Sequence, residues 1–70
     1  MDRELVESSM IKSIGYDPLE EVLEVEFNRG GVYQYLGVPE DVYTTVAESD
    51  SVGKSFSSLV KSKGYKYNIM

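Results

Sequence analysis

The sequence predicts an α+β domain, in which a three-stranded antiparallel meander is followed by a two-helix hairpin packed on one face of the sheet. Three observations lead to this prediction. Apolar and acidic residues alternate over 22–27, two stretches with helical apolar spacing follow Pro39, and the tail 65–69 alternates again. The tail is a possible short C-terminal edge strand. At 70 residues the chain is expected to form one domain, 1–70.

Strands are predicted over 9–16, 22–27 and 32–36. The first is irregular because Lys12 interrupts its apolar parity, and Asp17-Pro18 is the turn that ends it. The second is regular, and Glu24 and Glu26 are predicted on its solvent face, where they oppose edge-to-edge aggregation. Residues 1–8 are charged and are expected to be loosely held.

The loop between the second and third strands decides which way Tyr33 and Tyr35 face. A two-residue loop would force Arg29 into a positive φ, which a side chain disfavours. A three-residue loop, Asn28–Gly30, places glycine at the left-handed position instead. This register pairs Phe27 with Gly31, Val25 with Tyr33 and Leu23 with Tyr35, so we expect both tyrosines on the apolar face.

Two helices are predicted after Gly37. Pro39 is expected at the first helical position, with Glu40 and Asp41 in the first turn, where the helix dipole favours acids. Ser51 is predicted to cap the second helix and Gly64 to end it. The apolar stripes are Val42, Tyr43, Val46 and Ala47 in the first helix and Val52, Phe56, Leu59 and Val60 in the second.

Composition excludes much chemistry. The chain contains no cysteine and no histidine, so it lacks thiolate ligands, disulfides and the commonest general base. No signal peptide or membrane span is evident, and we expect a cytoplasmic, non-enzymatic protein without metal or cofactor. The acidic cluster around Glu20 to Glu26 lacks the spacing of a calcium loop.

Charge is strongly polarised along the chain. All twelve acidic residues lie at or before Asp50, whereas residues 51–70 carry four lysines and no acid. On a helical wheel Lys54, Ser57, Ser58 and Lys61 lie opposite the apolar stripe of the second helix. Lysines supply charge and serines supply directional donors, so this surface suits phosphate groups; an ordinary solvated helix face is the alternative.

Tyr33-Gln34-Tyr35, followed by Val38-Pro39 and Val42-Tyr43, resembles the central Y-x-Y region of the KTSC domain family. The resemblance covers about residues 8–67. This family takes its name from the C-terminus of some lysyl-tRNA synthetases, and it also occurs as a separate small protein. The resemblance implies no catalytic residues, and the link to a tRNA synthetase suggests RNA binding.

Two function classes follow from these observations. The first is a weak nucleic-acid-binding module, chiefly for structured RNA, in which the tyrosines stack on bases; the alternative for Tyr33 and Tyr35 is that their rings pack beneath the helices. The second is a protein-interaction module or homodimer using the opposite sheet face, where Val32 and Leu36 are expected beside Met10 or Ile11. The candidate nucleic-acid-binding residues are Lys54, Ser58, Lys61, Lys63, Lys66, Tyr33, Tyr35 and Tyr67.

Overall fold

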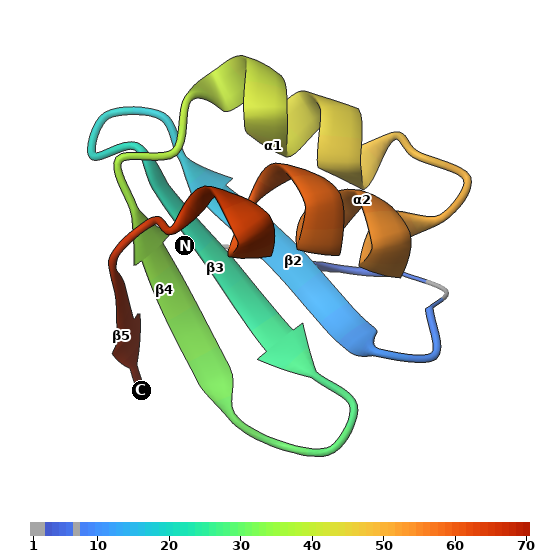
Figure 1. Cartoon of the computed structure of the whole chain (residues 1–70). Helices are drawn as coiled ribbons and strands as arrows, with labels where there is room; N and C mark the ends of the chain where they lie inside the picture. Colours follow the sequence, from blue (N-terminus) through green and yellow to red (C-terminus); the bar gives the residue numbers. More distant parts are fainter. Residues whose placement is uncertain (1–2, 7) are drawn as a thin grey trace.

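Antiparallel pairing joins five strands in chain order into one sheet (Figure 1). The computed structural model describes residues 3–6 and 8–70. The strands are β1 (Arg3–Leu5), β2 (Ile11–Asp17), β3 (Val22–Phe27), β4 (Val32–Leu36) and β5 (Tyr67–Ile69). The predicted α+β class is confirmed, and the suggested C-terminal edge strand is present as β5, which pairs with β4. The predicted three-strand meander is too short, because β1 also belongs to the sheet.

Strand β1 corrects the expectation that the N-terminal residues are loosely held. Arg3, Glu4 and Leu5 pair with Gly15, Ile14 and Ser13 of β2. All three β1 side chains are exposed, so no apolar alternation reveals the strand in the sequence. Backbone pairing and an ion pair of Arg3 hold it instead. Met1, Asp2 and Glu7 lie outside the described residues.

The hairpin between β3 and β4 has the predicted register. Leu23 pairs with Tyr35 and Val25 with Tyr33. The backbone N–H of Phe27 donates to the carbonyl of Gly31 at 3.1 Å, which closes the three-residue loop. Gly30 has a φ of 105°, a conformation that favours glycine. The prediction that the tyrosines share the face of Leu23 and Val25 is therefore confirmed.

A β-bulge in β2 explains the irregular pattern around Lys12. Ile11 pairs with Phe27 but Ser13 pairs with Glu26, so Lys12 is an extra, exposed residue. The bulge turns Ile11 toward the core, where it is fully buried. The expectation that Met10 or Ile11 lies on the opposite face is wrong, because Met10 also packs against the core.

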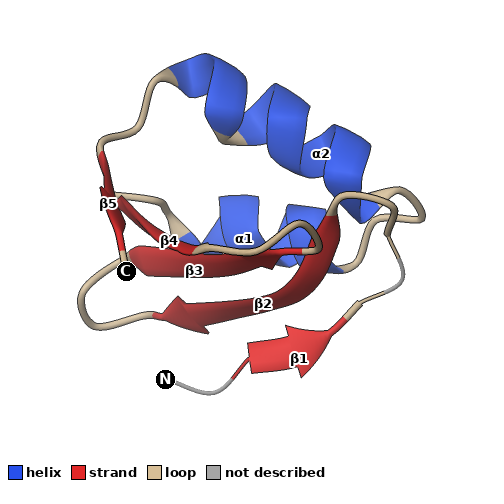
Figure 2. Ribbon diagram, turned by 90° about the horizontal axis from the view of Figure 1, so that it is seen from below, coloured by secondary structure: helices blue, strands red, loops and turns tan. Residues whose placement is uncertain are grey.

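Helices α1 (Glu40–Ala47) and α2 (Val52–Leu59) cover one face of the sheet (Figure 2). Pro39 has an extended ψ of 152° and therefore caps α1 rather than opening it as its first helical residue. Ser51 occupies the cap position of α2 as predicted, but its side chain makes no capping hydrogen bond. The Ser49 hydroxyl instead accepts the Ser51 backbone N–H at 3.1 Å.

A short 3₁₀ turn, η1 (Lys61–Lys63), follows α2. Gly64, with a φ of 74°, ends this turn rather than α2 itself. Gly64 therefore has the left-handed conformation expected of a C-cap, but it caps η1 and not α2 as predicted. The turn carries the chain from the helical layer back to β5 at the sheet edge (Figure 1).

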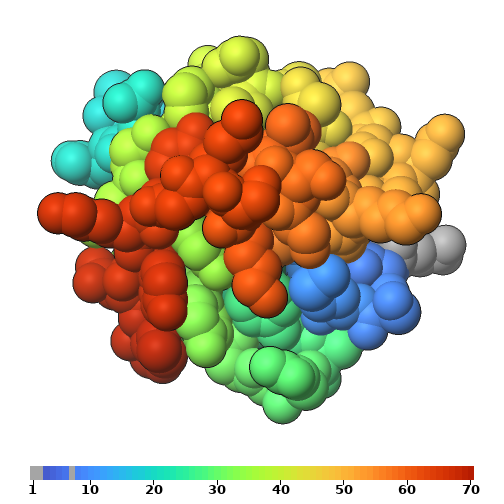
Figure 3. Space-filling model, in the orientation of Figure 1, coloured from blue at the N-terminus to red at the C-terminus, as the bar shows by residue number. Residues whose placement is uncertain are grey.

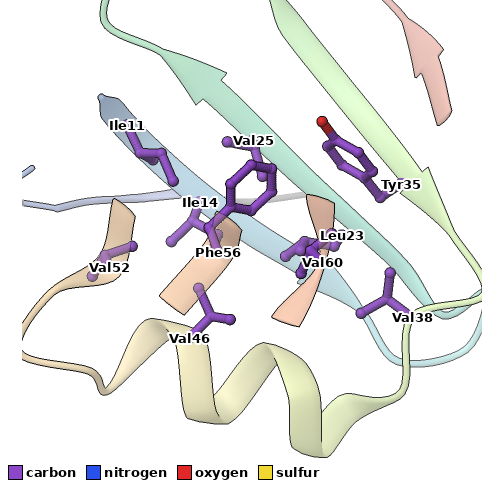
Figure 4. Close-up of a cluster of buried hydrophobic side chains, with 10 residues drawn as sticks. All are labelled: Ile11, Ile14, Leu23, Val25, Tyr35, Val38, Val46, Val52, Phe56 and Val60. Atoms are coloured by element: carbon purple, nitrogen blue, oxygen red, sulfur yellow. The ribbon is translucent and has the colours of Figure 1, made fainter. Parts of the chain in front are cut away.

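The core lies between the helices and the sheet, with Phe56 of α2 at its centre (Figure 4). Both predicted helical stripes face it, since Val46, Val52, Phe56 and Val60 are buried. The ten core residues are Ile11, Ile14, Leu23, Val25, Tyr35, Val38, Val46, Val52, Phe56 and Val60. Tyr35 is thus a core residue, whereas Tyr33 only packs against its edge.

The opposite face of the sheet carries a polar network rather than a continuous apolar patch. Arg3 donates to the Glu24 carboxylate at 2.6 Å, and Gln34 donates to its other oxygen at 2.9 Å. Beside them, the Ser13 hydroxyl donates to Glu26 at 3.2 Å. Glu24 is only 8% exposed, which corrects its predicted place on a solvated face.

Candidate functional site

A groove of about 800 Å³ opens between the β3–β4 loop, the strands β4 and β5, and the segment after α2. We call it the aromatic groove. In Figure 3 the green surface of β4 is visible between the orange end of α2 and the red C-terminal segment. The groove is lined by Ser9, Met10, Phe27, Asn28, Arg29, Gly30, Tyr33, Tyr35, Lys61, Gly64, Tyr65 and Tyr67.

Three tyrosines from two neighbouring strands form one side of the aromatic groove. The ring of Tyr67 lies with its centroid 5.4 Å from those of both Tyr33 and Tyr35. The pairing of Tyr35 with Tyr67 in adjacent strands puts these two side chains on the same face of the sheet. Tyr67 is 53% exposed, so a large part of this ring is open to a ligand.

Two phenylalanines support the tyrosines from below. Phe27 meets Tyr33 edge-on, with ring centroids 5.2 Å apart, and Phe56 meets Tyr35 at 5.3 Å. Phe27 and Phe56 are themselves 5.7 Å apart. Edge-to-face contacts of this kind fix ring orientation, so the groove floor is continuous with the rigid core.

Burial changes the pKa of Tyr35, whose ring forms part of the groove floor. Desolvation raises the pKa of the Tyr35 hydroxyl, and the neighbouring Tyr33 and Tyr67 hydroxyls raise it further. Tyr35 therefore remains a neutral phenol at physiological pH, able to donate or accept a hydrogen bond.

Two cationic side chains line the same groove. Arg29 comes from the β3–β4 loop and Lys61 from the turn after α2, and both residues are exposed. No acidic residue lines the groove among the residues that the structure describes. The chain has a net charge of −5, so this local absence of acids distinguishes the groove from the molecule as a whole.

The structure divides the predicted site residues into three groups. Tyr33, Tyr35, Tyr67 and Lys61 come together in the aromatic groove. Lys54 and Ser58 instead line a separate hollow of about 590 Å³, together with Asp50. Lys63 and Lys66 are exposed and line neither of these hollows. Lys61 thus shares a hollow with the tyrosines, whereas Lys54 and Ser58 share a different one.

Sequence reasoning missed Phe27, Arg29 and Tyr65 as groove residues. Arg29 lies in the loop whose register was predicted, so its nearness to Tyr33 could have been inferred from that hairpin. Tyr65 and Lys61 reach the groove only because η1 brings the chain back beside β4. No local pattern in the sequence indicates that return.

The described residues contain no group of three or more His, Cys, Asp or Glu side chains able to hold a metal ion. No helix among them is long and apolar enough to cross a membrane. The groove combines aromatic rings, which can stack on flat rings, with the cationic side chains of Arg29 and Lys61.

The sequence model of the KTSC domain matches residues 7–67, which is most of the chain. The chain belongs to the KTSC domain family. The resemblance based on Tyr33-Gln34-Tyr35 is therefore confirmed, and the structure places both tyrosines of this Y-x-Y motif in the aromatic groove.

The KTSC domain also occurs in relatives of two sizes. An uncharacterized protein of Stutzerimonas stutzeri is 42% identical over 67 residues, which cover 96% of this chain and 94% of that protein. A lysine–tRNA ligase of Nostoc punctiforme is 35% identical over 57 residues, which cover 81% of this chain but 10% of the ligase. The same domain is thus found alone and as a small part of a synthetase.

The crystal structure of a KTSC domain protein from Yersinia pestis has the same fold. Its TM-score is 0.93, at 39% sequence identity, and the match covers 99% of this chain and 96% of that one. A solved member of the family therefore shares this chain's arrangement of strands and helices.

Proposed function

We propose that this KTSC domain binds RNA weakly through the aromatic groove. The observation that carries the proposal is the meeting of the exposed Tyr67 ring and the half-buried Tyr33 ring with Lys61 and Arg29 in one hollow. Proteins that bind unpaired nucleotides combine these two elements, because aromatic rings stack on bases and cations neutralise phosphates. The other candidate lysines are assigned no direct role in this proposal.

Local charge supports the groove over the second hollow. Among the described residues, the groove is lined by two cations and no acid, whereas Asp50 lines the second hollow together with Lys54. A phosphate near Asp50 would be repelled at short range. The twelve acidic residues elsewhere in the chain keep the expected affinity low.

The relatives give independent support. A lysine–tRNA ligase is by its name an enzyme of tRNA, and those of Nostoc punctiforme and of a second Nostoc strain both include a segment similar to this chain. A domain appended to such an enzyme is well placed to contact its RNA.

Charge reversal at two lysines tests the proposal. Lys61→Glu and Lys54→Glu change the net charge by the same amount, but only Lys61 lines the groove. We expect Lys61→Glu to weaken binding to a bulk tRNA mixture by about tenfold, and Lys54→Glu to weaken it by less than about threefold.

Amide chemical shifts of the ¹⁵N-labelled protein, titrated with tRNA at low and moderate salt, give the affinity and locate the site. Shifts confined to the groove residues and reduced by salt would support the proposal. Equal losses in the two variants would indicate diffuse electrostatic contact instead. An absence of shifts at low salt would exclude RNA and favour a protein partner. If that partner is a second copy of this chain, the mass of the same sample would increase with protein concentration.

A further inference from the structure

Resting on the proposed function, we infer that the aromatic groove takes an unpaired stretch of RNA, with little preference among bases, and rejects duplex RNA. The aromatic floor is recessed, because Tyr35 is 6% exposed and Tyr33 packs against the core edge. In a duplex the base faces are covered by neighbouring base pairs, so a recessed ring cannot stack on them.

Two of the domain's cationic side chains lie with the aromatic rings. Duplex recognition depends mainly on phosphate and sugar contacts along the helix surface. Here Lys61 and Lys54 line different hollows, and Lys63 and Lys66 line neither. Among the described residues, Arg29 and Lys61 are the cations that share a hollow with the rings, so a strand that stacks in this hollow also lies near cationic side chains.

The polar groups of the groove give it little preference among the four bases. Direct reading of a base requires a donor or acceptor held in place and lacking another partner. The Asn28 amide, which could read a base edge, already donates to the Ser8 carbonyl at 2.8 Å. The tyrosine hydroxyls of the groove can each donate or accept a hydrogen bond, so they suit either kind of group on a base edge. Stacking adds affinity without selecting a base, because every base offers a face for it.

Because two cations line the groove, we expect the RNA affinity to depend only weakly on salt concentration. For single strands the slope of log affinity against log salt is about −0.7 for each neutralised phosphate, which gives about −1.4 for Arg29 and Lys61 together. A slope of about −3 or steeper would require the lysines outside the groove as well, and it would contradict binding through Arg29 and Lys61.

Fluorescence anisotropy with labelled RNA tests the inference directly. The probes are oligoadenylate and oligouridylate of about ten nucleotides and a duplex of about ten base pairs. We expect both single strands to bind at least about tenfold more tightly than the duplex, although the duplex carries more phosphates, and their affinities to differ by less than about tenfold. Equal or tighter duplex binding would overturn the inference but leave the proposed RNA-binding function intact. If neither these probes nor tRNA binds, the proposed function fails and the inference fails with it.

Tyr67 provides a matched pair of variants. Tyr67→Ala removes an exposed ring, and we expect it to weaken single-strand binding by about tenfold. Tyr67→Phe keeps the ring and should bind like the original protein. Ile69→Ala controls for truncation on β5, because Ile69 is also exposed but does not line the groove. Unchanged single-strand affinity in Tyr67→Ala would contradict stacking in this groove.

Discussion

The guanidinium of Arg3 reaches across β2 to the carboxylate of Glu24 on β3, at 2.6 Å. Arg3 pairs with Gly15, and Gly15 in turn pairs with Glu24, so the contact passes over a position without a side chain. Glu24 also accepts a hydrogen bond from Gln34 of β4 at 2.9 Å. One carboxylate thereby connects three strands and holds the β1 edge on the sheet.

Arg3→Ala should destabilise the domain. The substitution leaves the Glu24 carboxylate oxygen that accepts from Arg3 without this partner. The Glu24 side chain is only 11% exposed, so water replaces the lost donor poorly. We expect the free energy of unfolding to fall by about 1.5–3 kcal/mol, the range for a hydrogen bond to a charged group. Urea unfolding followed by circular dichroism measures this change.

Arg29→Ala is the control for the loss of an arginine, because Arg29 is exposed in a loop. It should change stability by less than about 0.5 kcal/mol. Equal effects of the two arginine variants would show that the Arg3–Glu24 contact contributes little.

Phe56 is the largest fully buried side chain among the described residues. It is fully buried and contacts the rings of both Phe27 and Tyr35 edge-on. Phe56→Ala should cost about 3–5 kcal/mol, much of the stability expected of so small a domain. Phe56→Leu should cost less and remain folded, and Leu19→Ala, at a 93% exposed position, should be neutral. Thermal unfolding of the three variants gives the order, and a neutral Phe56→Leu would argue against this packing.

Stability should decline at alkaline pH because of the buried tyrosine. Burial, followed by the effect of Tyr33 and Tyr67, raises the pKa of Tyr35 above its ordinary value of 10.0. Above that pH the unfolded chain loses the Tyr35 proton while the folded domain retains it, so unfolding is favoured as pH rises. Below it Tyr35 contributes no pH dependence.

Tyr35→Phe should flatten the alkaline decline, since it removes the ionising hydroxyl and keeps the ring. Urea midpoints measured across the alkaline range would show the difference in slope. Tyr16 and Tyr43 also have raised pKa values, so part of the decline should remain. An unchanged slope in Tyr35→Phe would show that Tyr35 does not cause it.

The β3–β4 loop should be intolerant of a side chain at Gly30. Its φ of 105° is unfavourable for any residue with a Cβ, although the space around it is open. Gly30→Ala should therefore cost about 1 kcal/mol or more through backbone strain alone. Because Gly30 also lines the groove, the amide shifts of Tyr33 report whether the loop has moved. A neutral effect on stability would imply that the loop relaxes into another turn.

Several features could be predicted from the sequence because their causes are local. Alternation defines β3, Pro39 and Ser51 mark the starts of the helices, and the glycines after Arg29 select the three-residue loop. That loop sets the register, and the register alone places Tyr33 and Tyr35 on the apolar face. The KTSC resemblance follows from the same local motif.

Other features depended on contacts between distant segments. The exposed side chains of β1 gave no apolar pattern, and its docking depends on the Arg3–Glu24 pair across 21 residues. Alternation places either Met10 or Ile11 on the opposite face, whereas with the bulge at Lys12 both pack on the core side.

Residue type and strand register, which are local properties, determined the Y-x-Y pair and its side of the sheet. Only the tertiary structure decided that Lys61 and Tyr67 join this pair while Lys54 does not. The physical reason is that the turn after α2 returns the chain to the sheet edge, and this path depends on how α2 packs over the core rather than on any pattern along the chain.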